Sequence, residues 1–323
     1  MILDRETADY RRPSLTDIEG ILVGHFTLRD RPTGCTVVTS MVPFTAGVDV
    51  RGGAPGTRET DLLRAENSVT QINAVFLSGG SAFGLDVGAG VARWLEEKGL
   101  GYRMAQICVP IVCGAILFDL NLGDARIRPD AQAGYEAARA AGPDPVAEGS
   151  KGAGAGCTVG KMFGPDRAMK GGLGSWAWQR DDGLRVGALA AVNCLGDVWD
   201  PARGVIVAGA TASDCRGFAD TMAQLRGGFR PENPDPGNTV IAVVATNAKL
   251  DKAGCTKVAQ MSHDALARCI YPAHTPADGD TVFAIATGMH SIGCNSAEIG
   301  VIGALAADVL ATAIVRGCQA AAA

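Results

Sequence analysis

Apolar residues in this chain fall into short runs, which polar or glycine-rich segments separate. Such runs are typical of buried strands and of helices with one apolar face. Runs rich in β-branched residues predict strands at residues 20–28, 35–42, 72–78, 171–179, 185–198, 202–211, 239–246 and 281–287. The run at 239–246, TVIAVVAT, is continuously apolar, so we expect its strand to be buried on both faces.

Helical periodicity predicts helices at residues 81–98, 130–141, 247–270 and 299–317. Ser81 and Asn247 are candidate N-terminal caps, and Gly99 and Gly142 are candidate residues just beyond a helix end. The last helix carries a single acid, Asp308, and should be buried on most sides. Strands that alternate with helices indicate a layered α/β fold.

The remaining segments are predicted to be irregular. Residues 1–20 form a polar lead-in, residues 48–63 a long loop, and residues 148–164 a glycine-rich loop. Residues 226–238, RGGFRPENPDPGN, contain three prolines and three glycines and predict an exposed linker that runs directly into the strand at 239.

Composition narrows the choice of partners and compartment. The 323 residues carry a net charge of −5 and no block of basic residues, which argues against nucleic acid and anionic membranes as partners. The N-terminus lacks an apolar signal segment, and we find no uncharged apolar stretch long enough to span a bilayer. The ten cysteines form no C-x-x-C pair and are expected to be buried thiols in a reducing cytoplasm.

Familiar ligand-binding motifs are incomplete. The four histidines never occur at metal spacing, so we expect no metal site and no cofactor. In GAGAGCTVGKM, Ala155 and Met162 break the phosphate-loop pattern, and Cys157 stands at the third glycine position of the dinucleotide pattern. Phe83 breaks the nucleophile-elbow pattern in GGSAFG.

The stretch PENPDPGNTVIAVVAT is more informative, because a polar linker meets a buried strand at Thr239. Further along, Asp278 and Asp280 precede the strand at 281–287, and an i, i+2 pair in extended chain points both carboxylates the same way. Lys161 ends the glycine-rich loop. From the residues alone, these could equally be a turn, two solvated acids and a surface lysine.

A family resemblance favours chemistry at these positions. The segments VRGGAPGTRETDLL, LSGGSAFGLDVGAGVARWLEEKG, GAGAGCTVGK, PGNTVIAVVATN and DGDTVFAIATG resemble the DmpA-type aminopeptidases, which are self-cleaving N-terminal-nucleophile hydrolases. The likeness extends from about residue 18 to residue 316. The Asn-Thr junction and the Asp-Gly-Asp triplet are most similar to the branch of nylon-oligomer (6-aminohexanoate-oligomer) endohydrolases.

The resemblance implies one hydrolase domain, residues 1–323, with an αββα sandwich fold. The Thr239 hydroxyl would attack the Asn238 carbonyl and leave fragments 1–238 and 239–323 packed together. Thr239 would then be both nucleophile and base, because a free α-amino group has a pKa of about 8.

The resemblance also assigns the other site residues. Asp278 and Asp280 would orient the hydroxyl and ammonium groups, Lys161 would offset their charge, and Asn193 would donate to the oxyanion. Phe118 stands where family members carry a tyrosine, in the region that would contact the substrate. The resemblance further implies a homo-oligomer, commonly a tetramer of cleaved units.

Three functions remain open at this stage. An amide hydrolase would cut 6-aminohexanoate oligomers or other short linear amides, or would release N-terminal residues from small peptides, including β- and D-amino-acid peptides. An acyl transferase similar to ornithine acetyltransferase is an alternative, although its longer signature is missing from the sequence. An uncleaved binding or structural protein is the third possibility.

Overall fold

A single long strand, β2 (Gly34–Val50), runs through both layers of strands in the computed structural model. The structure describes residues 13–231, 237–293 and 295–322. Its first half pairs with β1 (Leu22–Thr27) and β4 (Ile72–Ser78), and its second half pairs with β16 (Thr281–His290). The pairing with β4 shifts register within β2, between Thr39 and Phe44. The strand therefore passes from one sheet into the other.

Each half of β2 belongs to a sheet of its own. The first sheet has the order β1–β2–β4–β7–β3, with β7 at Val112–Ile116 and β3 at Thr57–Arg58. The second has the order β10–β11–β14–β16–β2, in which the new strands are β10 (Leu173–Gln179), β11 (Arg185–Asn193) and β14 (Thr239–Ala248). The neighbours β14 and β16 are parallel, and β11 and β2 flank them on either side.

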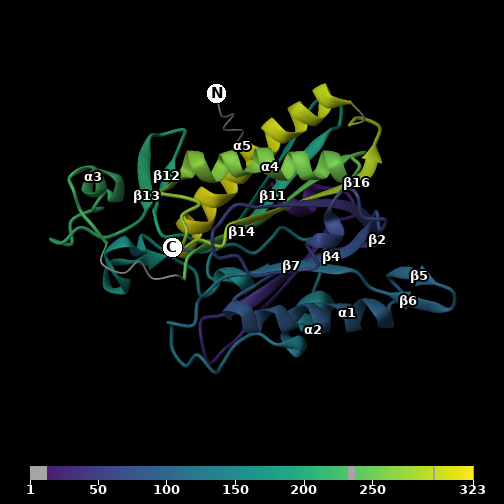
Figure 1. The fold of residues 1–323 in the computed structure, drawn as a ribbon, viewed down its shortest axis with the longest axis horizontal. Coiled ribbons are helices and arrows are strands. Elements are labelled where there is room, and N and C mark those ends of the chain that lie inside the picture. Colours follow the sequence, from purple (N-terminus) through teal and green to yellow (C-terminus); the bar gives the residue numbers. More distant parts are fainter. Residues whose placement is uncertain (1–12, 232–236, 294, 323) are drawn as a thin grey trace.

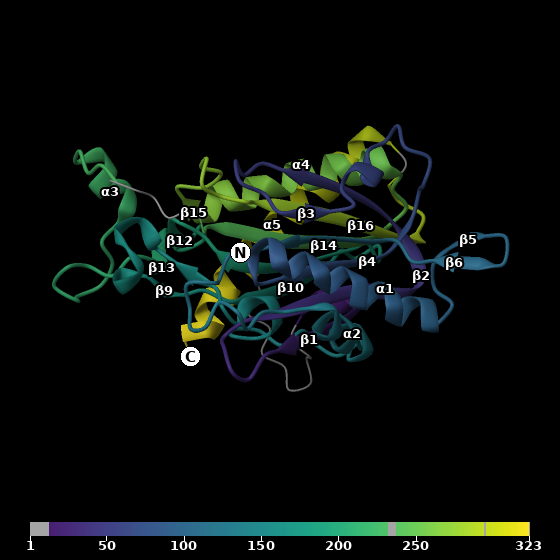
Figure 2. The ribbon, with the colours of Figure 1, turned by 60° about the horizontal axis from the view of Figure 1, so that its bottom comes forward.

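Helices cover the outer face of each sheet (Figure 1). α1 (Val87–Glu97) and α2 (Ala131–Arg139) pack against the first sheet, and α4 (Lys252–Cys269) and α5 (Ser296–Ala322) pack against the second. Figure 2 shows the short α3 (Thr221–Arg226) away from these layers. The small strands near it are β12 (Asp197–Asp200), β13 (Val205–Ala208) and β15 (Ile270–Tyr271), which form a sheet of their own.

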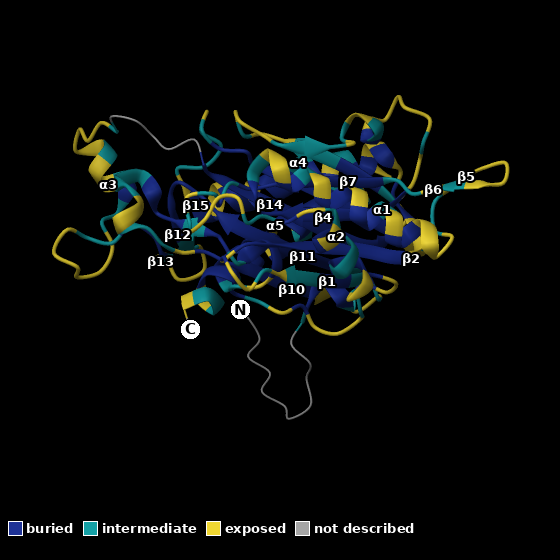
Figure 3. Cartoon of the chain, turned by 90° about the horizontal axis from the view of Figure 1, so that it is seen from below, coloured by how far each residue is buried: buried dark blue, intermediate teal, exposed yellow. Residues whose placement is uncertain are grey.

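The apolar core separates into three clusters that match this layering. One lies between the second sheet and α4 and α5, one between the two sheets, and one between the first sheet and α1 and α2. Three interfaces require four layers, so the expected αββα sandwich is confirmed. The strands are buried almost throughout, whereas the covering helices expose one face (Figure 3).

Two short hairpins complete the described strands. β8 (Thr158–Val159) pairs with β9 (Met169–Lys170) beside the glycine-rich loop. β5 (Tyr102–Met104) and β6 (Ile107–Val109) form a hairpin that projects from the body of the molecule (Figure 2).

Both predicted N-terminal caps are wrong. Residues Ser81–Asp86 form a 3₁₀ turn, and Ser81 itself has a left-handed backbone (φ 54°), so α1 begins only at Val87. Asn247 still belongs to β14, where its side chain hydrogen-bonds across to the backbone of Arg185 and Gly183. The Asp251 carboxylate caps α4 instead, by accepting from the Gly254 N–H.

The lead-in and the loops are also more structured than expected. Residues 1–12 and 232–236 of the predicted lead-in and linker lie outside the described residues. Leu15 and Ile18 are fully buried in the cluster between the sheets, so the end of the lead-in is part of the core. The loop predicted at 48–63 contains the end of β2, β3 and a 3₁₀ turn at Asp61–Leu63.

Among the described residues, α5 is the one helix that is long and apolar enough to cross a membrane. More than half of its apolar window is buried within the protein, where α5 packs on β10, β11 and α4. This packing is what the sequence predicts for a core helix with a single acid.

Candidate active site

The side chain of Thr239 lies where β14 enters the second sheet. Thr239 pairs with Asn193 of β11, and two residues later Ile241 pairs with Thr281 of β16. Alternate residues of a strand share a face, and Ile241 belongs to the cluster between the two sheets. The Thr239 side chain therefore faces the rim of the layer between the sheets, and the residue is only 4% exposed.

The peptide bond before Thr239 is held at its carbonyl oxygen. The Asn238 carbonyl accepts a 2.9 Å hydrogen bond from the Gly279 N–H and a short one from the Thr239 hydroxyl. A Cβ on Gly279 would lie 2.8 Å from the Thr239 Oγ1, so glycine leaves room for the hydroxyl. A hydroxyl beside a carbonyl that accepts an N–H is suited to the transfer of an acyl group from nitrogen to oxygen.

Lys161 and Asn193 converge on the preceding carbonyl, that of Gly237. Lys161 Nζ donates to this oxygen at 2.9 Å and Asn193 Nδ2 donates to it at 3.1 Å. Lys161 Nζ also donates to the Asn193 carbonyl at 2.9 Å and to the Asn193 side-chain oxygen at 3.2 Å. The alternative that Lys161 is a surface lysine is wrong, because the residue is buried.

The glycine before Lys161 explains how the loop brings this lysine inside. Gly160 has a left-handed backbone (φ 69°), and a Cβ there would lie 2.0 Å from the Ala210 nitrogen. Only glycine permits this approach, after which the Lys161 N–H donates to the Leu195 carbonyl at 2.9 Å.

Asp278 and Asp280 are buried at the start of β16 and each is 2% exposed, so the alternative of two solvated acids is wrong. Asp278 Oδ2 accepts from the Thr275 N–H at 2.6 Å. Asp280 Oδ1 accepts at 2.7 Å from the N–H of Val240, the residue after Thr239. Both acids thus lie around the start of β14, on either side of Gly279.

Burial changes the acidity of one member of this pair. It raises the pKa of the Asp278 carboxyl to about 6, and the nearby charge of Asp280 adds to the rise. The positive charge of Lys161 acts in the opposite direction. Asp278 can therefore gain or lose a proton close to neutral pH.

The sequence did not predict the part played by His274. Its ring Nδ1 lies 2.8 Å from Asp280 Oδ2, and its backbone N–H donates to the same oxygen at 3.2 Å. The described residues contain no group of three His, Cys, Asp or Glu side chains arranged to hold a metal ion. The distances make His274 and Asp280 a hydrogen-bonded pair, which only the folded path of residues 271–280 brings together.

Phe118 lies beside the same segment. A Cβ on Gly237 would lie 2.5 Å from the Phe118 ring, and the Phe118 carbonyl accepts from Asn193 Nδ2 at 2.9 Å. The structure thus brings Phe118 together with Asn193, Lys161 and the residues that precede Thr239.

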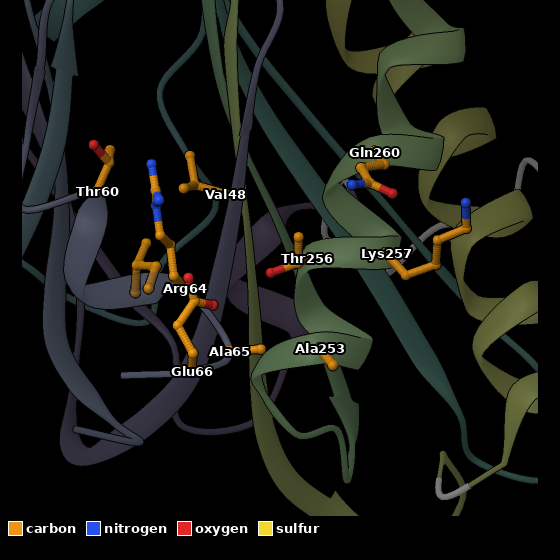
Figure 4. A pocket seen from close by; sticks show the side chains of 10 residues that line it. Val48, Thr60, Arg64, Ala65, Glu66, Ala253, Thr256, Lys257 and Gln260 are labelled. Atoms are coloured by element: carbon orange, nitrogen blue, oxygen red, sulfur yellow. The ribbon is translucent and has the colours of Figure 1, made fainter. Parts of the chain in front are cut away.

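A cavity of about 400 Å³ lies elsewhere, between the segment around residues 60–66 and the first half of α4 (Figure 4). Its lining includes Thr60, Arg64 and Glu66 on one side and Thr256 and Gln260 on the other. None of the predicted site residues lines it. The chemistry around Thr239 and this open volume are separate features of the molecule.

Comparison with solved structures supports the fold. The L-aminopeptidase D-Ala-esterase/amidase of Ochrobactrum anthropi, described as a variant of the N-terminal-nucleophile hydrolase fold, aligns with a TM-score of 0.72 and 19% identity. The alignment covers 98% of this chain and 88% of that chain. A β-aminopeptidase of Burkholderia aligns with a TM-score of 0.69 and 22% identity, covering 97% and 88%.

Comparison of sequences identifies the family. An aminopeptidase of Mycobacterium tuberculosis, itself described as uncharacterised, is 42% identical over 94% of this chain and 93% of its own length. A 6-aminohexanoate-oligomer endohydrolase of Kocuria is 29% identical over 94% of this chain and 85% of its own length. The model of peptidase family S58 matches residues 13–323. Because that match spans nearly the whole chain, the protein belongs to peptidase family S58 and is an amide-bond hydrolase.

Proposed function

We propose that the protein cuts itself between Asn238 and Thr239 and then works as an N-terminal threonine amide hydrolase. The Thr239 hydroxyl attacks the Asn238 carbonyl carbon, an ester bond forms, the C–N bond breaks, and the proton passes to the freed amine. Water then hydrolyses the ester. The observation that carries this proposal is the Asn238 carbonyl, which contacts the Thr239 hydroxyl and accepts the Gly279 N–H.

In the cleaved enzyme, Thr239 provides both nucleophile and base. The new α-amino group has a pKa of about 7.7–8.0 in an unperturbed setting, so it can accept the hydroxyl proton near neutral pH. Asp278 and Asp280 orient the hydroxyl and the ammonium group, since both acids are buried around the start of β14.

Lys161 and Asn193 act on the substrate carbonyl in this proposal. Both donate to the Gly237 carbonyl in the uncleaved chain, and both would redirect this hydrogen bond to a substrate carbonyl once residues 237–238 have moved away. Asn193 supports the oxyanion, and Lys161 balances the charge of the acids. Phe118 offers a ring without a hydroxyl beside the same position.

The strand order supports a complex of the two fragments that survives the cut. Fragment 239–323 contributes β14 and β16 to the second sheet, and fragment 1–238 contributes their outer neighbours β11 and β2. The catalytic unit is therefore the whole domain, residues 1–323, made of two chains.

We also propose that the cleaved units form a homo-oligomer in the cytoplasm, a tetramer by resemblance. The support on this chain is the projecting β5–β6 hairpin. It exposes Tyr102, Met104, Ile107 and Val109, an apolar surface suited to a second copy. The mass of the cleaved protein in solution, measured by analytical ultracentrifugation, tests this part.

The substrates we propose are short linear amides, with 6-aminohexanoate oligomers first. The Asn-Thr junction, the Asp-Gly-Asp triplet and the 29% identical endohydrolases support this choice. The release of N-terminal residues from small peptides is the second candidate, and the more similar aminopeptidases of Mycobacterium favour it. Acyl transfer is a distant third.

A denaturing gel with N-terminal sequencing tests self-cleavage directly. Purified protein should give two bands, and the smaller fragment should begin at Thr239. Thr239→Ala should give one band and no hydrolysis, whereas Thr239→Ser, which keeps the hydroxyl, should still process. An active sample with one intact chain would overturn the proposal.

A second experiment separates the substrates. The cleaved enzyme is given a linear 6-aminohexanoate oligomer and, separately, an amino-acid amide. Faster hydrolysis of the oligomer supports the first candidate, and faster release of ammonia from the amide supports the second. Transfer to an added amine that exceeds hydrolysis would support the acyltransferase instead.

A further inference from the structure

The two oxygens of Asp280 are held by three N–H groups. Val240 N–H donates to Oδ1 at 2.7 Å, while His274 directs both its backbone N–H and its ring Nδ1 at Oδ2, at 3.2 and 2.8 Å. Hydrogen bonds of this kind favour the charged form of a carboxylate. One oxygen of Asp280 is thus fixed to the nucleophile strand and the other to the loop that carries His274.

The backbone of His274 has an unusual conformation. Its φ of 56° lies in the left-handed region, which side-chain-bearing residues seldom adopt. In this conformation the main-chain N–H and the ring nitrogen of one residue reach the same carboxylate oxygen. Strained residues of this sort persist where the surrounding structure holds them, and they gather at functional sites.

A second histidine packs behind His274. The rings of His263 and His274 meet edge to face, with centroids 4.9 Å apart. His263 is 1% exposed, and its Nε2 lies 3.0 Å from the Asp49 carbonyl oxygen. Because a carbonyl oxygen can only accept, this nitrogen must carry the hydrogen.

The other nitrogen of His263 shows that its ring is neutral. In the described part of the chain, His263 Nδ1 is buried and has no hydrogen-bond partner, as expected for a bare lone pair. Burial also lowers the pKa of His263. A neutral ring behind His274 adds no positive charge beside the contact between His274 and Asp280.

We propose that His274 is a positioning residue of the catalytic acid pair: its ring nitrogen and its backbone N–H fix one oxygen of Asp280, so that the other oxygen stays against the Val240 N–H at the start of β14. This inference rests on the proposed function. Asp278 is held by another residue, Thr275, through its N–H and its side chain, and burial raises the pKa of Asp278. The position of Asp280 within the pair thus depends on His274.

The charged and titratable groups around His274 come from three other elements. Asp280 at the start of β16 and His263 of α4 contact it directly. Asp49 of β2 lies behind His263, with Oδ2 3.6 Å from Nε2, and Arg51 lies 2.6 Å from the same Asp49 oxygen. Asp49 and Arg51 compensate each other, and Asp280 is the acid that His274 contacts directly.

The test compares His274→Ala with His274→Asn, because the asparagine amide can replace the N–H that the ring nitrogen supplies. Self-processing of newly translated chains is followed on gels across the acidic and neutral pH range. His274→Ala should process about tenfold to hundredfold more slowly, the factor expected for losing one hydrogen bond to a charged group.

His274→Asn should recover most of the rate. His290→Gln serves as the control, because His290 lies far along β16 and bonds to the Asp182 carbonyl instead. Thermal melting of each variant confirms folding.

Each outcome decides a different claim. If wild type processes and His274→Ala matches it at every pH, or if the Ala and Asn variants are equally slow, the role of His274 is wrong while self-cleavage stands. If the wild-type chain itself never processes, the proposed function fails, and the inference fails with it.

Discussion

Two buried lysines in this protein both donate hydrogen bonds to backbone carbonyls, but their surroundings differ. Lys161 donates to backbone carbonyls around Thr239, and Lys252 donates to the carbonyls of Leu62 and Asn67 at 2.8 Å each. Lys161 is 8% exposed and Lys252 is 6% exposed. Lys252 sits at the start of α4, next to the cavity of Figure 4, and burial lowers its pKa.

The difference lies in what surrounds each ammonium group. Lys161 lies near the buried acids Asp278 and Asp280 and donates to the segment that we propose is cut. Lys252 instead links a loop to α4 through hydrogen bonds, beside the cavity of Figure 4. Around Thr239, Gly237 packs against the Phe118 ring, and none of the predicted site residues lines the cavity of Figure 4. Buried polar groups therefore identify this candidate site better than empty space does.

Replacing Lys161 should have the largest effect on processing. Lys161→Met keeps an unbranched side chain but removes the donor that holds the Gly237 carbonyl, one residue before the bond that we propose is cut. Misplacing this segment should slow self-cleavage by about 100-fold or more. Gel densitometry of newly translated chains measures the rate. If Lys161→Met processes at the wild-type rate, Lys161 has no part in self-cleavage, and the proposed difference between Lys161 and Lys252 is wrong.

Gly279→Ala should come next. The added Cβ would lie 2.8 Å from the Thr239 Oγ1 and 2.9 Å from the Ala54 carbonyl, so the hydroxyl must move. A displacement of this size costs roughly 100-fold in rate at a catalytic centre. Gly288→Ala, at an open left-handed position further along β16, is a control that adds a methyl group to the same strand without a clash. Equal slowing in both variants would show that a general disturbance of β16, and not the displaced hydroxyl, is responsible.

Asp278→Asn should abolish efficient processing and yet stabilise the fold. The pKa of Asp278 is raised to about 6, so the folded state binds the proton more tightly than the unfolded chain does. Stability should therefore fall as pH rises from about 4 to about 6, by an amount on the order of 2 kcal/mol. In a Thr239→Ala background, Asp278→Asn should remove this slope in thermal melts. A slope of the opposite sign would contradict the assignment.

Lys252→Met should affect stability alone. Two part-buried carbonyls lose their donor, which costs about 1–3 kcal/mol, and the melting temperature should drop accordingly. Processing by the folded protein should match wild type. A large loss of processing would make the two lysines functionally alike.

Gln260→Ala should have the smallest effect. The side chain lines the cavity beside α4, and such changes usually shift stability by less than about 0.5 kcal/mol. Processing and hydrolysis should both be unchanged. Measurable loss of hydrolysis would instead give the cavity a functional part.

The sequence predicted the features that depend on short stretches of chain. Continuous apolar runs marked β14 and β16, and the junction motifs picked out Thr239, Asp278 and Lys161, which the structure brings to one rim. The sequence did not predict features that depend on the pairing of segments far apart in the chain. Asn247 has the composition of a cap but lies in a strand, because β11 offers backbone partners that the local sequence cannot reveal.

His274 and Gly279 were missed for a related reason. His274 stands only six positions before its partner Asp280, but the contact needs a left-handed turn that its residue type does not favour. The Gly279 N–H is a main-chain donor, and only its place opposite Asn238 in the parallel bridge gives it a role.

Strand β2 has a consequence for how the molecule comes apart. It spans residues Gly34–Val50 and makes backbone hydrogen bonds with strands of both sheets. Neither sheet can therefore unfold without breaking hydrogen bonds of the other. Denaturation should thus be a single cooperative transition, with no half-folded species that keeps one layer intact. A break or charge introduced midway along this strand would weaken two hydrophobic interfaces at once.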